Sequence, residues 1–128
     1  LSLHFNSSGG NGNGAEQAGL ETYCLTPAGM PSTLTRGYDD DARQVFPNNE
    51  FDVPNLQFAL QIHRAALRAT GAADRGVRRA RFMTVLQGQR CPAVLIEAGY
   101  LSNPKEAQRI ADWQFRQRLA EAIAEALK

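Results

Sequence analysis

Short apolar runs recur along the chain, and their spacing predicts strands that alternate with helices. In LSLHF (1–5) the apolar residues alternate with a serine and a histidine, as in a strand with one covered face. LETYCL (20–25) is rich in residues that favour strands. RFMTVL (81–86) and AVLIE (93–97) are more continuously apolar, which is typical of strands covered on both faces by helices. The sequence therefore predicts four strands.

Three further segments are predicted to be helices, from apolar spacing or from helix-start residues. Residues 55–70 place apolar side chains three and four positions apart, and Gly71 follows as a suitable stop. Residues 103–111 begin with Asn103 as a cap, a proline at the first helical position and a glutamate three residues after the cap. From Asp112 an apolar residue recurs every fourth position. The element order predicts an α/β fold with a twisted, mainly parallel sheet flanked by helices on both faces.

Two stretches lack either pattern and are predicted to be loops. The first, 6–19, is rich in glycine and asparagine, and the second, 26–54, contains four prolines and an acidic run. Loops as long as the second are usually functional rims or disordered segments. The 128 residues suffice for a single domain with its own core. Because the chain opens in mid-strand with Leu1, we expect the domain to be incomplete at its N-terminal end.

The composition narrows the classes of function. Fourteen basic and thirteen acidic residues give a formal net charge of +1, which argues against a nucleic-acid or acidic-lipid binder. No apolar run approaches the length of a membrane span. Cys24 and Cys91 could pair or remain free thiols, and their spacing does not decide between these states.

His4 and Glu97 are the residues that most suggest chemistry. His4 lies on the polar side of its strand, and Glu97 closes an apolar run where a charge is costly. Ligands of α/β sheets gather at the carboxyl ends of strands, so we expect both side chains at one sheet edge. An imidazole can bind a divalent metal, and a carboxylate can accept a proton from metal-bound water. Either residue could instead be an ordinary surface or ion-paired residue.

Four stretches, in this order, resemble the zinc-dependent N-acetylmuramoyl-L-alanine amidases of the amidase-3 type, which are peptidoglycan hydrolases. They are SLHFN (2–6), GLETYCL (19–25), DRGVRRARFMTVL (74–86) and PAVLIEAGYLSNPKEAQRI (92–110). The last is the most specific, because Ala93–Asn103 matches as a unit with Glu97 at its centre. The resemblance weakens in the 26–54 connection.

The resemblance implies that His4 is a Zn²⁺ ligand and Glu97 the catalytic carboxylate. It also implies cleavage of the amide between the lactyl group of N-acetylmuramic acid and the L-alanine of the stem peptide. Such cell-wall-degrading autolysins act outside the cytoplasmic membrane. The family carries two further ligands, a histidine and a glutamate, on a preceding strand and segment. We therefore expect the 128 residues to be the C-terminal portion of a catalytic domain, lacking its first strand and helix.

Other polar residues receive weaker predictions. Asn6 is expected to organise the loop after His4, and Glu21 to lie at the rim of the site, although a salt bridge is equally compatible with Glu21. Arg75 belongs to an arginine cluster that could bind stem-peptide carboxylates or simply be a solvated face. We take Asn6, Glu21 and Arg75 as candidate substrate contacts. His63 lies on the apolar side of its helix and is expected to be structural.

Two functions remain open on the sequence. The first is the zinc amidase, acting as a monomer on the glycan strand and stem peptide of peptidoglycan. The alternative is a non-catalytic cell-wall-binding module that keeps the amidase scaffold without a complete metal site. The missing ligands favour the module, whereas the costly carboxylate of Glu97 favours the enzyme.

Overall fold

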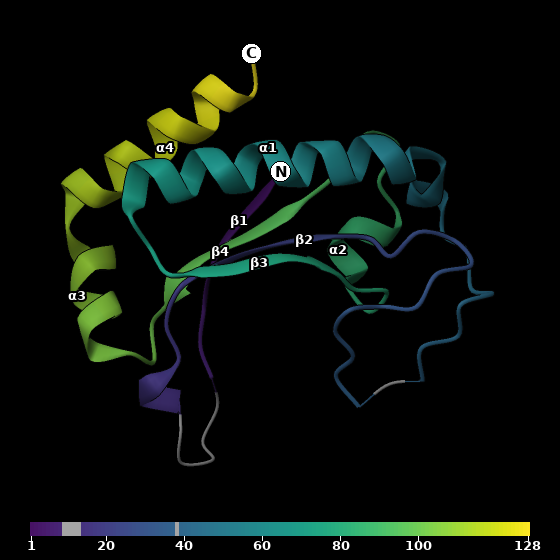
Figure 1. Cartoon of the computed structure of the whole chain (residues 1–128), viewed down its shortest axis with the longest axis horizontal. Coiled ribbons are helices and arrows are strands. Elements are labelled where there is room, and N and C mark those ends of the chain that lie inside the picture. The colour runs from purple at the N-terminus through teal and green to yellow at the C-terminus, as the bar shows by residue number, and fades with distance from the viewer. Residues whose placement is uncertain (9–13, 38) are drawn as a thin grey trace.

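A four-stranded mixed sheet forms the centre of the protein (Figure 1). The computed structural model describes residues 1–8, 14–37 and 39–128, so residues 9–13 of the predicted 6–19 loop lie outside the described residues. The strands are β1 (Ser2–Asn6), β2 (Leu20–Cys24), β3 (Asp74–Arg79) and β4 (Leu95–Tyr100), in the spatial order β1-β4-β2-β3. The β1–β4 and β2–β3 pairs are parallel, and the β2–β4 pair is antiparallel. The predicted α/β class with a mainly parallel sheet is confirmed.

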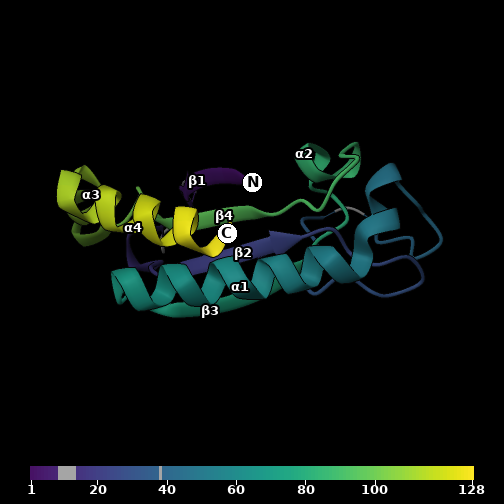
Figure 2. The same cartoon turned by 90° about the horizontal axis from the view of Figure 1, so that it is seen from above.

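Two helices cover one face of this sheet, as Figures 1 and 2 show. They are α1 (Asp52–Thr70), which ends at Gly71 in the left-handed conformation, and α4 (Trp113–Ala126). Their apolar sides meet the sheet in one buried cluster, which includes Leu20, Ala59, Ile62, Ala66, Val94, Ile96, Ala98, Leu119 and Ile123. Both helices were predicted from their apolar spacing, because burying such a stripe is what stabilises a helix in a domain.

The third strand is not where the apolar pattern placed it, so the prediction of a strand over 81–86 is wrong. That segment holds two turn residues and the short helix α2 (Thr84–Gln87), and its buried Met83 and Leu86 pack over one end of the other sheet face. The strand is instead the charged segment β3, at the sheet edge. An edge strand pairs on one side only and tolerates charged side chains, which apolar periodicity does not detect.

Helix α3 (Pro104–Ala111) begins as predicted, but its glutamate has another role. The Asn103 side chain accepts hydrogen bonds from the backbone N–H groups of Lys105 and Glu106. The buried Glu106 carboxylate does not complete a capping box: it accepts the backbone N–H groups of Gly19 and Tyr100. Glu106 therefore ties α3 to the start of β2 and the end of β4. Two 3₁₀ turns, Gly14–Glu16 and Pro47–Phe51, interrupt the predicted loops.

The two cysteines do not form a disulfide in this structure. Cys24 is buried, Cys91 is exposed, and both thiols are free. Of the two states left open by the sequence, the structure therefore has the free thiols. None of the helices in the described ranges is long and apolar enough to cross a membrane.

Candidate active site

Polar residues from three neighbouring strands line up across the sheet face that α1 and α4 leave uncovered. His4 of β1 is the register partner of Glu97 of β4, and Glu97 is in turn the register partner of Glu21 of β2. Register partners project from the same face of a sheet. The predicted convergence of His4 and Glu97 is confirmed, and Glu21 joins them.

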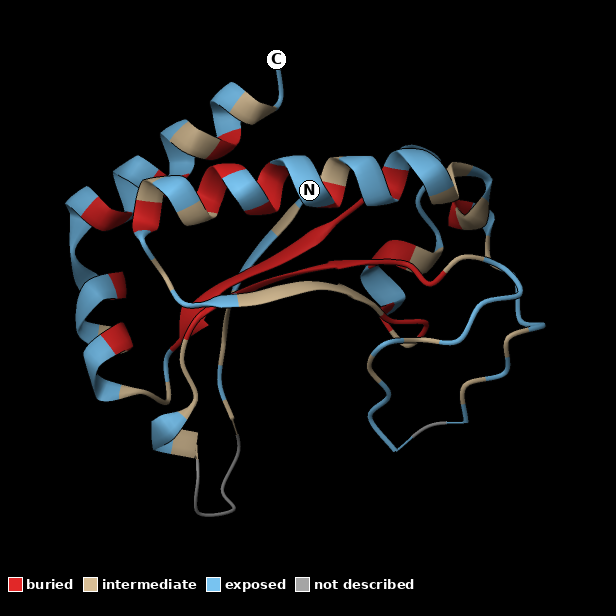
Figure 3. Ribbon diagram, in the orientation of Figure 1, coloured by how far each residue is buried: buried red, intermediate tan, exposed pale blue. Residues whose placement is uncertain are grey.

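The location differs from the prediction in one respect. Glu97 was expected to end its strand, but β4 continues to Tyr100, and His4 likewise lies inside β1. Their side chains therefore share a sheet face and not a row of strand ends. Figure 3 shows β2 and β4, which carry the two glutamates, as the most buried part of the sheet.

Glu21 is a buried carboxylate that is held from several sides. Its Oε1 accepts hydrogen bonds from the Tyr100 hydroxyl at 2.8 Å and from the Asn6 amide at 3.4 Å. Its Oε2 lies 3.6 Å from Nε of Arg75 and 3.9 Å from Nε of Arg78. Burying a charge is tolerable only with such partners. The salt bridge that we left open for Glu21 is present, and both Asn6 and Arg75 contact it.

Glu97 is buried as well, but it is much less satisfied. Its Oε2 is buried without a hydrogen-bond partner in the described part of the chain. Burial and, next, the negative charge of Glu21 raise the pKa of Glu97 to about 7, against the opposing effect of the positive charge of Arg36. A carboxylate that titrates near neutral pH can accept and return a proton under physiological conditions.

Two β-bulges bring the other site residues to this face. Between the pairs Leu20–Asp74 and Thr22–Val77, β3 uses one more residue than β2, and Gly76 there has a φ of +84°. A bulge resets the alternation of side chains. As a result Arg75 and Arg78, three positions apart, both reach Glu21.

The second bulge lies in β4 and acts on Tyr100. Between the pairs His4–Glu97 and Asn6–Tyr100, β4 uses one more residue than β1, and Gly99 there has a φ of +143°. Tyr100 consequently shares a face with Glu97, three positions earlier, and its hydroxyl reaches Glu21. Burial and the hydrogen bond to Glu21 raise the pKa of Tyr100 to about 12, so its hydroxyl remains a donor.

A chain of polar contacts, which runs from the buried Thr22 and His63 to the exposed Asp74, anchors the first bulge. The Thr22 hydroxyl lies 3.0 Å from Nδ1 of His63, whose Nε2 lies 2.9 Å from the Asp74 carboxylate. The same carboxylate oxygen accepts the backbone N–H of Gly76 at 2.7 Å. His63 is thus structural, as predicted, and its contact with Asp74 supports the bulge that aims Arg75 and Arg78.

The described residues supply one plausible zinc ligand but not a complete set. His4 is exposed, and its Nε2 lies 2.8 Å from the Ser2 hydroxyl. No group of three or more His, Cys, Asp or Glu side chains suited to holding a metal ion occurs within residues 1–8, 14–37 and 39–128. A zinc site needs three or four protein ligands. The residues described here therefore do not fit a zinc ion by themselves.

Sequence reasoning missed Arg36 and Tyr100. Arg36 lies in an irregular loop with no periodic signal, and only the fold brings its charge near Glu97. Tyr100 stands three residues after Glu97, which in a regular strand would place it on the opposite face. Gly99 between them was the available signal, because a glycine inside a strand often marks a bulge.

The match to a known family covers the same residues as this site. A family model described as N-acetylmuramoyl-L-alanine amidase matches residues 1–128, and the chain therefore belongs to that family. Among curated proteins it is 28% identical over its whole length to the sporulation-specific N-acetylmuramoyl-L-alanine amidase of Bacillus subtilis, covering 38% of that protein. It is also 43% identical over 56 residues, 44% of this chain and 19% of the relative, to the probable cell wall amidase LytH of Staphylococcus aureus.

Solved structures agree with this assignment. The chain superposes with a TM-score of 0.67 and 32% identity on the catalytic domain of CwlV, an N-acetylmuramoyl-L-alanine amidase from Bacillus (Paenibacillus) polymyxa var. colistinus. The superposition covers 98% of this chain and 53% of that domain. Ami1 of Mycobacterium smegmatis, at 19% identity and a TM-score of 0.68, shares the fold, with 98% of this chain and 50% of that chain covered. The chain thus spans about half the length of these solved amidases.

Proposed function

We propose that the protein containing this chain is a peptidoglycan hydrolase that cleaves the amide between the lactyl group of N-acetylmuramic acid and L-alanine. Family membership and the likeness to amidases along the whole chain support this proposal. The observation that carries it is the row of His4, Glu97 and Glu21 on the open sheet face, where Glu97 is buried and its Oε2 has no hydrogen-bond partner among the described residues.

In this proposal Glu97 is the general base and then the general acid. Its carboxylate accepts a proton from the water that attacks the amide carbonyl. The same proton is then passed to the nitrogen of the departing L-alanine as the C–N bond breaks. Burial supports this role, because a pKa near 7 suits both accepting and returning a proton at neutral pH.

Zinc enters the proposal through the family, with His4 as one ligand and the remaining ligands supplied by residues outside this chain. When bound, zinc would polarise the amide carbonyl and lower the pKa of a water molecule. The chain's own contribution is the raised pKa of Glu97: burial and the negative charge of Glu21 raise it, and the positive charge of Arg36 limits the rise.

We assign substrate contacts to the residues around Glu21. Arg75 and Arg78 are both only partly buried, and their guanidinium groups carry donors beyond those that reach Glu21. They suit a carboxylate of the stem peptide. Asn6 contacts Glu21 from the β1 side and borders the same cavity as Arg75. An enzyme with this substrate would act outside the cytoplasmic membrane, and we expect it to act as a monomer.

The decisive experiment replaces the proposed base in the full-length protein. Glu97→Gln keeps the shape of the side chain but cannot accept the proton, so we expect peptidoglycan hydrolysis to fall by roughly 10² to 10⁴-fold. Released amino termini of L-alanine report the rate. Glu121→Gln on the exposed side of α4 is the matched control and should retain full activity. Full activity in Glu97→Gln would refute the assignment.

Metal dependence needs a separate measurement on the same full-length protein. We expect a chelator to abolish hydrolysis and added zinc to restore it, with His4→Ala lowering the bound zinc. Unchanged activity after complete metal removal would contradict the zinc part of the proposal. The role of Glu97 would still be tested by the Glu97→Gln substitution described above.

The alternative is a non-catalytic wall-binding module on the same scaffold. The lack of a three-ligand group among the described residues favours it. A module would bind isolated cell walls with equal affinity in the wild type and in Glu97→Gln, and it would release no L-alanine amino termini. The amidase would release them in the wild type only.

A further inference from the structure

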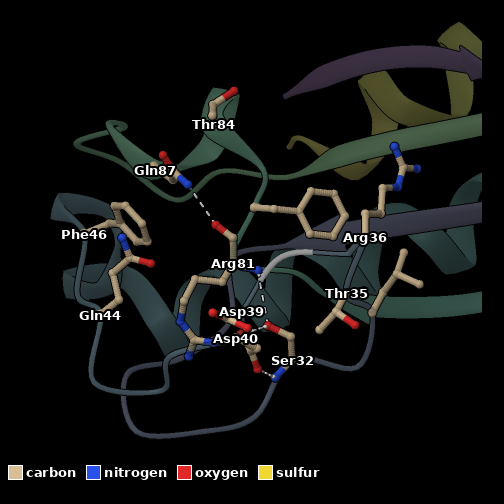
Figure 4. A pocket seen from close by; sticks show the side chains of 12 residues that line it. Ser32, Thr35, Arg36, Asp39, Asp40, Gln44, Phe46, Arg81, Thr84 and Gln87 are labelled. Atoms are coloured by element: carbon tan, nitrogen blue, oxygen red, sulfur yellow. Dashed lines mark hydrogen bonds and ion pairs between the residues drawn. The ribbon is translucent and has the colours of Figure 1, made fainter.

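A cavity of about 610 Å³ lies between the irregular segment after β2 and the segment that carries α2 (Figure 4). Its volume falls within the range of sites for small ligands. The residues that matter for its chemistry are Arg36, Asp39, Gln44, Phe46, Phe82 and Gln87. None of them belongs to the His4–Glu97–Glu21 row.

The walls of this cavity are fixed even though they are built from loop residues. Buried Arg81 pairs through Nη1 with Asp40, and its Nη2 donates to the Met30 carbonyl at 2.7 Å. Asp40 also accepts the backbone N–H of Ser32 at 2.6 Å and the Ser32 hydroxyl at 2.8 Å. On the other wall, the Gln87 amide donates to the Arg81 carbonyl at 2.8 Å. The cavity is therefore preformed, which lowers the entropic cost of binding.

The lining combines two opposite charges with amides and half-buried rings. The Arg36 guanidinium lies 5.2 Å from the centre of the Phe82 ring. Within the described ranges, neither Arg36 nor Asp39 forms an ion pair, and both are exposed. An anion and a cation of one ligand could therefore bind Arg36 and Asp39 respectively without breaking an ion pair that the described residues form.

This lining suits a peptide better than a sugar. Sugars commonly bind by stacking on an open aromatic face, but Arg36 occupies a position over Phe82, and Phe46 is packed against the buried cluster below. The side-chain amides of Gln44 and Gln87 provide both donors and acceptors for peptide groups.

The cavity also adjoins a second cavity that borders Glu21 of the candidate active site. Leu34 and Arg36 line it, and the same two residues line a second cavity of about 470 Å³ beside Glu21 and Tyr100. The charge of Arg36 also acts on Glu97. A substrate whose amide lies near Glu97 could therefore extend into the 610 Å³ cavity.

We propose that this cavity is a subsite for the distal part of the stem peptide, with Arg36 binding a carboxylate and Asp39 binding a free amine. The proposal deepens the proposed function and rests on it for the choice of substrate. The ligand of this cavity would be a short peptide with charges of both signs. The glycan strand would bind outside this cavity.

Binding can be tested without hydrolysis, by calorimetry on the full-length protein. The probe is a synthetic tripeptide that begins with L-alanine and carries one acidic and one basic side chain. We expect Arg36→Gln and Asp39→Asn each to weaken binding about fivefold, as for loss of one exposed charged contact. Asp41→Asn and Arg43→Gln are matched controls, because these exposed residues pair with each other and do not line the cavity. They should bind like the wild type.

Three results would overturn the subsite. These are wild-type affinity in both Arg36→Gln and Asp39→Asn, equal losses in the two controls, or displacement of the tripeptide by a disaccharide of the glycan strand. Glu97→Gln separates this proposal from the proposed function. If the tripeptide binds as expected but Glu97→Gln does not affect hydrolysis, the subsite stands and the role of Glu97 as the base is refuted. If Glu97→Gln abolishes hydrolysis but the Arg36 and Asp39 variants bind the tripeptide like the wild type, the base stands and the subsite is refuted.

Discussion

The two faces of the central sheet are built from the same strands but have opposite character. On the face under α1 and α4, the side chains of β2 and β4 include Leu20, Cys24, Ile96 and Ala98, and they are buried among apolar helix residues. On the other face, the same two strands place Glu21 and Glu97 in register, both nearly inaccessible to water. Two neighbouring buried carboxylates oppose folding, and proteins retain such costly groups mainly where chemistry needs them.

The contrast shows that burial has two uses in one small sheet. Under the helices, burial removes apolar area from water and stabilises the fold. On the open face, burial raises the pKa of Glu97 to about 7, at the expense of stability. Substitutions on the two faces should therefore have opposite effects, which the following predictions test in order of expected size.

The largest effect on stability is expected under the helices. Ile62→Ala removes a fully buried side chain between α1 and the sheet, so the free energy of unfolding should fall by about 2 to 5 kcal/mol. Leu127→Ala, at a position that is 57% exposed, should cost far less. Chemical denaturation measures both. Equal losses in the two variants would mean that the helix face is not the main core.

On the open face, Glu97→Gln is expected to stabilise the protein above neutral pH. The folded pKa of about 7 exceeds the ordinary value of 4.5, so the folded state holds the proton more tightly. Stability should therefore fall as the pH rises from about 4.5 through about 7. Glu97→Gln should remove this fall and gain roughly 1 to 3 kcal/mol at pH 8. A variant that is less stable than the wild type at pH 8 would contradict this account of Glu97.

Gly76→Ala tests the bulge in β3 that allows both Arg75 and Arg78 to reach Glu21. At a φ of +84° an added side chain should cost about 1 to 2 kcal/mol, and relaxation of the bulge would turn Arg75 away from Glu21. We expect a raised KM along with the loss of stability. Gly88→Ala is the control, because Gly88 has a φ of −91° and its added Cβ would meet no atom within 4 Å. A comparable loss in Gly88→Ala would remove the special role of the bulge.

The smallest expected effect concerns the influence of the negative charge of Glu21 on the pKa of Glu97. Glu21→Gln should lower the pKa of Glu97, because it removes a neighbouring negative charge. The general base would then ionise at lower pH, so the rising limb of the pH–rate profile should shift to lower pH. Glu16→Gln, an exposed residue before β2, should leave the profile unchanged. A shift to higher pH in Glu21→Gln would contradict the coupling.

Much of the fold followed from local patterns. The spacing of apolar residues located α1 and α4, and the cap residue Asn103 with Pro104 marked the start of α3 correctly. The pattern failed at β3 because apolar periodicity detects covered strands, and β3 is a charged edge strand. It failed in the opposite way at 81–86, where an apolar run predicted a strand but forms a turn and α2.

The site was predictable only in part. His4 stood out as a reactive group on the polar side of a strand, and Glu97 as a charge that closes an apolar run. Their adjacency needed only parallel pairing of two strands. The arrangement around Glu21 was not predictable in this way, because two bulges reset the alternation on which strand reasoning depends. Arg36 carried no local signal at all.

By itself, the sequence determined which segments bury apolar surface and which residues carry reactive groups, because both depend on side-chain chemistry and short-range spacing. Only the tertiary structure decided which reactive groups share a face, since bulges and strand order set that through contacts between distant segments. It also decided the raised pKa of Glu97, because burial and the nearby charges of Glu21 and Arg36 exist only in the folded chain.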